Sequence, residues 1–318
     1  MNVETEKRGV AVQETGSTDL RGGLIGDGSP LDEPSARGSG RGRRSTAAGR
    51  PGARGRRRSG NRAPFGFVPL AVLGIVFLAL PVVGMILRAP WRELPADLTD
   101  PGVLTALRLS LVCSVSAVAV SCLIGVPLAW LLARVSFPGR TVARALVVLP
   151  MVLPPVVGGV ALLLAFGRNG LAGQWLDRAF GITLPFTTTG AVMAETFVAM
   201  PFLVVTVEAG LRSLGQRYED AASTLGAGRW STFRRVTLPL IAPSLGAGAA
   251  LCWARALGEF GATITFAGNM PGRTQTMPLA VYVALQNNVG GAIALSLVLL
   301  VVSLTLLIAL RGHWFGSR

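Results

Sequence analysis

The chain has 318 residues, of which 51% are hydrophobic and 14% are charged, and its formal net charge at pH 7 is +14. A soluble domain of this length needs a more polar surface, so the composition indicates a membrane protein. One histidine and three scattered cysteines exclude histidine-based catalysis and give no basis for a metal site or a disulfide framework.

Residues 1–63 are dominated by Gly, Ser, Arg and Pro and contain almost nothing to bury. This composition predicts a disordered Arg/Gly-rich cytoplasmic tail in front of a transmembrane domain, residues 64–318. The basic excess has two interpretations: it retains the amino terminus inside the cell, or it binds anionic membrane lipid. Nucleic-acid binding is not expected, because no aromatic residues are interleaved with the arginines.

Five stretches after the tail are apolar for about 20 residues, which is long enough for a helix to cross a ~30 Å hydrocarbon core. The first is longer than the apolar part of a signal peptide and lacks a cleavage pattern, so we expect it to be retained. A sixth stretch, 238–266, is mostly apolar but contains two charged residues. The sequence therefore predicts an all-α membrane protein with about six transmembrane helices. The first five stretches are 67–87, 109–132, 145–165, 190–209 and 291–310.

Arginines are concentrated in the segments 134–144 and 212–235 and after residue 310. By the positive-inside rule these segments are cytoplasmic, which places both termini in the cytoplasm of a cell-membrane protein.

The third stretch contains Pro150, Pro154 and Pro155. Proline leaves backbone carbonyls unpaired, and a broken helix is tolerated at membrane depth only where protein or a water-filled cavity covers it. The stretch is either a kinked packing helix or a helix that lines a translocation pathway.

The segment "YEDAASTLGAGRWSTFRRVTLPLIAP", 218–243, separates two apolar stretches but is itself polar. Its spacing predicts a short helix, a turn at Gly226 and Gly228, and a second helix that leads into the next span. It is either an amphipathic segment on the lipid headgroups or a docking element for a cytoplasmic partner. The first helix presents Ala221, Ala222 and Leu225, the second presents Trp230, Phe233 and Val236, and Arg229, Arg234 and Arg235 can face water or lipid phosphates.

The order "DAASTLGA" followed by "F..V.LP...P" resembles the EAA loop of ATP-binding-cassette (ABC) importer permeases. Asp220 stands where this family usually has Glu, which leaves open whether Glu219 or Asp220 makes the family's contact. The resemblance implies that the loop 212–239 couples this chain to an ATPase subunit. The implied coupling residues are Glu219, Asp220, Ala221, Ala222, Gly226, Ala227, Arg229, Phe233, Leu238 and Pro239.

The blocks "LARVSFPGR", "LPMVLPPVVGGVALLLAFGRNG" and "RALGEFGATITFAGNMPGRTQTMPLAVY" are similar to the permease subunits of molybdate importers. The resemblance implies the type I importer fold, a homodimer, two ATPase subunits and an extracytoplasmic molybdate-binding protein. Sulfate, thiosulfate and tungstate permeases are close relatives of this family, so these oxyanions remain alternatives.

The chain itself has no means to hydrolyse ATP. A phosphate-binding Walker loop needs a lysine, and the only lysine is Lys7, in the tail. We therefore expect no catalytic residues, metal or cofactor on this chain, with ATP and Mg²⁺ bound by the partner ATPase.

Arg255 and Glu259 lie one helical turn apart within the sixth stretch. They form a structural ion pair, or Glu259 with Phe260 and Gly261 forms a constriction in the pathway. Glu195, in the fourth stretch, invites the same two interpretations.

Selectivity is expected to belong mainly to the binding protein, because strong capture in the pathway would slow release. The residues of the outer loops are either ordinary solvated residues or its docking site. They are Arg168, Asn169, Asn269, Arg273 and Thr274. A stand-alone secondary transporter is the competing class, but it needs acids or histidines through several spans, and this chain has few.

Overall fold

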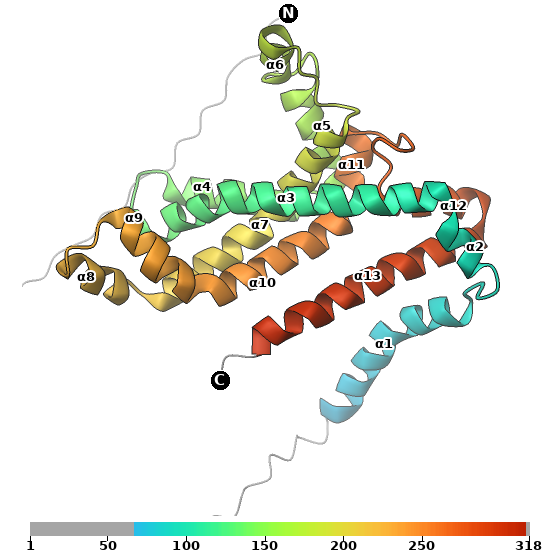
Figure 1. The fold of residues 1–318 in the computed structure, drawn as a ribbon, viewed down its shortest axis with the longest axis horizontal. Helices are drawn as coiled ribbons and strands as arrows, with labels where there is room; N and C mark the ends of the chain where they lie inside the picture. The colour runs from blue at the N-terminus through green and yellow to red at the C-terminus, as the bar shows by residue number, and fades with distance from the viewer. Residues whose placement is uncertain (1–66, 316–318) are drawn as a thin grey trace, which may run out of the picture. The chain divides into compact units, whose positions relative to one another are not determined.

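The computed structural model describes residues 67–315, without the side chains of 306, 307 and 309–315. The predicted tail, residues 1–63, lies outside this range. All regular structure in the described part is helical, so the all-α prediction is confirmed (Figure 1). The elements are α1 (Phe67–Leu87), α2 (Leu94–Thr99), α3 (Pro101–Arg134), α4 (Arg140–Val152), α5 (Pro155–Phe166), α6 (Gly173–Phe180), α7 (Thr188–Leu214), α8 (Arg217–Thr224), α9 (Arg229–Thr232), the π-helical turn η1 (Phe233–Thr237), α10 (Leu238–Leu257), α11 (Gly261–Phe266), α12 (Met277–Asn287) and α13 (Val289–Phe315).

Four helices of the described part are long and apolar enough to cross a membrane: α1, α3, α7 and the continuous helix 229–257 that α9, η1 and α10 form. The apolar helix α5 and the apolar part of α13 are shorter. Each of the six predicted stretches overlaps one of these elements. Two of the six are not single helices, because 145–165 is divided into α4 and α5, and 238–266 into α10 and α11.

The break between α4 and α5 follows from consecutive prolines. A residue that precedes proline is disfavoured in the α conformation, and both Leu153 and Pro154 precede one. Their ψ angles are 134° and 133°, and Pro155 then begins α5, where proline is well tolerated. Pro150 lies inside α4 and does not end it.

Helix α7 lies at the centre of the helical packing, with α3 and α10 as its main neighbours. The buried face of α3 consists largely of small residues, including Ser110, Ser114 and Gly125. Small residues allow helix backbones to approach closely, which in a membrane replaces the hydrophobic driving force of a soluble core. Two hydrogen bonds fix this face: Met277 N donates to Ser110 Oγ (2.7 Å) and Trp253 Nε1 donates to Ser114 Oγ (2.8 Å).

The two helix breaks face each other, because α5 packs against α11. A Cβ atom on Gly159 would lie 2.6 Å from Thr265 Cβ and 3.0 Å from the Ala262 carbonyl oxygen. A Cβ atom on Gly261 would lie 2.8 Å from Pro155 Cβ. Glycine is therefore required at both positions by close approach, and the pair α5 and α11 is held in direct backbone contact.

We expect Gly159→Val to separate α5 from α11 and to lower the free energy of unfolding by about 1 to 3 kcal/mol, because overpacked atoms must move apart. Thermal unfolding of the purified chain in detergent measures this change. Gly246→Ala in α10 is the control, since a Cβ there meets nothing within 4 Å and should be neutral or slightly stabilising. Equal unfolding midpoints for wild type and Gly159→Val would contradict the close-packing account.

Candidate coupling site and pathway break

A buried ion pair fixes the base of the polar loop between α7 and α10. Arg134, the last residue of α3, approaches Glu219 of α8 with Nε 3.0 Å from Oε2. Its Nη2 also donates to the Gly215 carbonyl oxygen (2.7 Å), and Thr237 Oγ1 of η1 donates to Glu219 Oε1 (2.9 Å). The side chains of Arg134 and Glu219 are only 6% and 18% exposed. We call Arg134, Glu219, Thr237 and Gly215 the loop anchor, because they join α3, the end of α7, α8 and η1.

The loop anchor separates the roles of the two neighbouring acids. Glu219 points inward and is occupied by Arg134 and Thr237, whereas Asp220 is exposed and has no ion-pair partner among the described residues. Of the two acids, Asp220 is therefore the one that an external partner can reach.

The turn after α8 has the predicted position and a backbone that requires glycine. Gly226 has a φ of 82°, in the left-handed region that residues with a Cβ rarely adopt. Ala227 N donates to the Ala222 carbonyl oxygen (3.0 Å) across this turn. Leu225 beside it is 88% exposed. The turn therefore presents an apolar side chain to the outside.

The predicted second apolar row divides into an inner and an outer residue. Phe233 packs against the core formed by α3, α7 and α10, while Trp230 is 72% exposed. The two rings stack with centroids 5.7 Å apart. Val236 is half-buried, and Leu238 and Pro239 begin α10 at the end of η1. The π-helical turn contains an extra residue per hydrogen-bonded ring, a feature that is common at functional sites.

A second ionic cluster joins α4 to α7. Glu208, which is buried, accepts two hydrogen bonds from Arg144 (3.1 and 2.5 Å) and pairs with Arg212 (2.9 Å). Neither these residues nor Arg134 were among those predicted from the sequence. The ion pair of Glu208 with Arg212 could have been predicted, because Glu208 is an acid at the end of an apolar stretch with an arginine four residues later. No local pattern predicts the ion pair of Arg134, since its partner Glu219 is 85 residues away.

The predicted pair Arg255 and Glu259 is present at the break between α10 and α11. Arg255 Nη1 lies 2.5 Å from Glu259 Oε2, but this approach lacks hydrogen-bond geometry and leaves Oε2 without a hydrogen-bond partner. Glu259 Oε1 accepts from Ala262 N (2.8 Å) and so caps α11. Glu195 is also fully buried, and its Oε2 has no hydrogen-bond partner among the described residues. Both interpretations, structural pair and pathway constriction, remain predictions.

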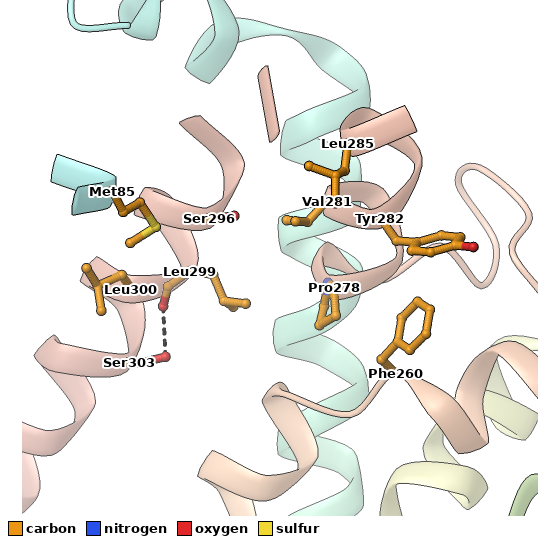
Figure 2. Close-up of a pocket in the computed structure, with 10 residues that line it drawn as sticks. All are labelled: Met85, Phe260, Pro278, Val281, Tyr282, Leu285, Ser296, Leu299, Leu300 and Ser303. Carbon is orange, nitrogen blue, oxygen red and sulfur yellow. Dashed lines mark hydrogen bonds between the residues drawn. The ribbon is translucent and has the colours of Figure 1, made fainter. Parts of the chain in front are cut away.

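Phe260 lies at the edge of a cavity of about 510 Å³ (Figure 2). Its ring contacts Tyr282 of α12 with centroids 5.1 Å apart. Met85 of α1 and Ser303 of α13 lie on the opposite wall, and Ser303 Oγ donates to the Leu299 carbonyl oxygen, so the wall presents mainly apolar atoms. Pro155 and Gly261 therefore meet at the paired helix breaks, with Phe260 turned towards α12, whereas Pro150 lies inside α4.

The predicted docking residues differ in their access to solvent. Arg168 and Asn169 are exposed, with Arg168 Nε 3.2 Å from Asp177 Oδ2, and Arg273 is exposed in the loop before α12. Thr274 is fully buried, and its hydroxyl accepts from Met270 N (2.9 Å).

Asn269 is half-buried and its Oδ1 has no hydrogen-bond partner. Thr274 therefore holds the loop from inside, and the exposed members of the docking set are Arg168, Asn169 and Arg273.

Comparison with known proteins gives one family. Residues 125–318 match the family described as "Binding-protein-dependent transport system inner membrane component". The chain is 47% identical over 235 residues to the molybdenum transport system permease protein ModB of Mycobacterium tuberculosis, covering 73% of this chain and 88% of that protein. It is 39% identical over 249 residues to the sulfate transport system permease protein CysT of Escherichia coli, covering 76% of this chain and 90% of that protein.

Among solved structures, a bacterial ABC transporter involved in the import of alginate matches with a TM-score of 0.62. The match covers 78% of this chain and 93% of that one, at 19% sequence identity. At this identity the likeness concerns the fold alone, and it agrees with the predicted importer architecture.

Removing one member of the loop anchor should destabilise the protein. We expect Glu219→Gln to lower the free energy of unfolding by about 2 to 3 kcal/mol, because it leaves the Arg134 charge buried without its partner. The value lies below that for a fully buried pair since Glu219 is partly exposed. The double variant Arg134→Met/Glu219→Gln should lose less than the sum of the single changes.

Thermal unfolding of the three variants gives this double-mutant cycle. Asp220→Asn is the matched control, because the neighbouring acid is exposed and its change should lie within about 0.5 kcal/mol of wild type. Strictly additive losses, or an equal loss in Asp220→Asn, would show that the anchor is not coupled.

Proposed function

Because the chain belongs to the family of binding-protein-dependent transport system inner membrane components, we propose that it is the permease subunit of an ATP-driven oxyanion importer whose substrate is molybdate. Membership makes it a multi-pass transporter subunit of the inner membrane and not a catalytic enzyme. The proposal adds a homodimer, two ATPase subunits that bind ATP and Mg²⁺, an extracytoplasmic molybdate-binding protein, and cytoplasmic termini.

The observation that carries the coupling proposal is the loop anchor. It holds α8 rigidly through Glu219 while Asp220 and Leu225 stay exposed at its outer side. A rigid element with an exposed acid and an exposed leucine suits insertion into a cleft of a partner. A flexible loop could not transmit force, because partner motion would be absorbed within the loop.

Force on α8 has two routes into the membrane domain. The ion pair with Arg134 leads into α3, and the hydrogen bond from Thr237 leads into η1 and α10. Glu208, through Arg144 and Arg212, ties α4 to the end of α7. ATP-driven closure of the two ATPases would draw the α8 helices of the dimer together and tilt these spans.

The paired helix breaks are the proposed position of the gate. Short helices that end at membrane depth can shift as units without breaking further hydrogen bonds. Glu259 ties the end of α10 to the start of α11 through Arg255 and Ala262, so movement of α10 would be passed to α11 and, through Gly261, to α5. Alternating access then opens the path first to the binding protein and then to the cytoplasm.

Molybdate is the proposed substrate because the relative at 47% identity is named for molybdenum transport. Sulfate is the second candidate, because a sulfate permease is 39% identical over 76% of this chain. The two oxyanions have the same charge and tetrahedral shape, so selection between them belongs to the binding protein rather than to this chain.

Uptake into proteoliposomes that contain the permease, its ATPase and its binding protein tests the substrate. We expect ATP-dependent molybdate accumulation that continues in a 100-fold excess of sulfate. An excess of this size would reveal even weak competition between the two oxyanions. ATP-dependent sulfate uptake that molybdate does not inhibit would replace molybdate by sulfate. Uptake without any ATPase would support the stand-alone transporter instead.

Reversing the charge of the exposed acid tests the coupling role. We expect Asp220→Lys to reduce co-purification of the ATPase subunit by about 10-fold or more, because a like charge or a lost ion pair at an interface is costly. The unfolding midpoint of the permease should not change, since Asp220 is exposed. Glu93→Lys, at another exposed acid, is the matched control. Full ATPase retention and uptake in Asp220→Lys would contradict the role.

A further inference from the structure

We propose that the start of the α9–η1–α10 helix binds the phosphate headgroup of an anionic lipid such as phosphatidylglycerol. A pocket of about 400 Å³ lies there, lined by Trp230, Ser231, Arg234 and Arg235. We call these four residues the headgroup pocket. The inference rests on the proposed function in one respect, namely that α10 crosses the membrane and η1 lies at its surface.

The charges of the headgroup pocket are not neutralised within the described part of the chain. Arg234 and Arg235 are exposed and form no ion pair there, in contrast to Arg134 and Arg144, each of which holds a glutamate. Two guanidinium groups beside the hydroxyl of Ser231 offer several hydrogen-bond donors to one anion. Guanidinium groups match phosphate oxygens in both charge and geometry.

An apolar cavity adjoins the headgroup pocket. It measures about 330 Å³, and its lining consists of Pro127, Trp130, Arg229, Trp230 and Phe233. Trp230 belongs to both cavities. A polar pocket for an anion next to an apolar cavity is the arrangement that an amphiphile needs, because its phosphate and its acyl chain must bind side by side. Free phosphate would occupy only the headgroup pocket and would leave the apolar cavity empty.

Trp230 is held in place for this role. Its ring stacks on Phe233, which packs against the core, yet 72% of the residue remains exposed. An exposed tryptophan is costly in water but favourable at a membrane interface, where its ring meets acyl chains and its N–H meets headgroups. The position fits, because Leu238, the third residue after Arg235, begins the apolar helix α10.

The lipid would stabilise the helix that receives force from the loop anchor. Thr237, the last residue of η1, donates to Glu219, while Arg234 and Arg235 lie on the exposed side of the same five-residue turn. A lipid bound there fixes η1 from the membrane side and the anchor fixes it from the loop side.

The test uses the permease with its ATPase in nanodiscs, and native mass spectrometry counts the lipids retained. The discs contain phosphatidylcholine with a minor fraction of phosphatidylglycerol, and a second set contains the same two lipids with free inorganic phosphate added. We expect wild type to retain phosphatidylglycerol. Arg234→Gln and Arg235→Gln should each weaken retention about 5-fold and together about 30-fold, because each basic residue near an anionic lipid contributes about 1 kcal/mol. Arg92→Gln, at an exposed arginine elsewhere, should match wild type.

The double variant Arg234→Lys/Arg235→Lys keeps both charges and should retain much of the lipid. It tests the proposal if the glutamine double variant fails to fold. Phosphatidylglycerol on the glutamine double variant at the wild-type level, or none on wild type, would overturn the proposal. So would displacement of the lipid by free phosphate. Loss of the ATPase with unchanged lipid would assign the two arginines to the ATPase interface instead. Failure of wild type to retain any ATPase would count against the proposed function and leave the lipid count as a separate result.

Discussion

The ion pair between Arg134 and Glu219 is the interaction on which the polar loop between α7 and α10 depends. Burying two charges costs several kcal/mol, and this cost is offset only where geometry is good and the remaining hydrogen-bonding groups are satisfied. Here Gly215 and Thr237 supply the additional hydrogen bonds. The result is a polar helix that emerges from an apolar domain without being free to move on its own. The proposed transmission of force from a partner requires rigidity at this place.

The second constraint is that backbone hydrogen bonds are broken only where other protein covers the break. The consecutive prolines 154 and 155 end one helix and start another, and Gly258 to Phe260 do the same between α10 and α11. In hydrocarbon each such break would be costly alone. Packing α5 on α11 brings the two together, and Gly159 and Gly261 permit the contact. Glu259 satisfies one free N–H at the start of α11.

The same logic explains where polar residues lie elsewhere in the domain. Ser110 and Ser114 of α3 accept hydrogen bonds from neighbouring elements, and Glu208 is held by two arginines. Glu195 differs, because one of its carboxylate oxygens is buried without a partner. A polar group left unsatisfied at low dielectric is expensive, so such groups in a native fold are usually retained for function.

The sequence by itself determined the helical class, the apolar stretches, the proline break and the helix–turn–helix around Gly226. These features depend on local rules: apolar length, the conformation before proline, and the need for glycine at positive φ. It also determined the family, through the pattern from Asp220 to Pro239. Only the tertiary structure decided that Glu219 is the inward acid, that Thr274 is buried and that α10 ends before Glu259. The first of these depends on a partner far along the chain. Arg134 is 85 residues from Glu219, and no spacing rule predicts a contact that only the packing of α3 beside α7 creates.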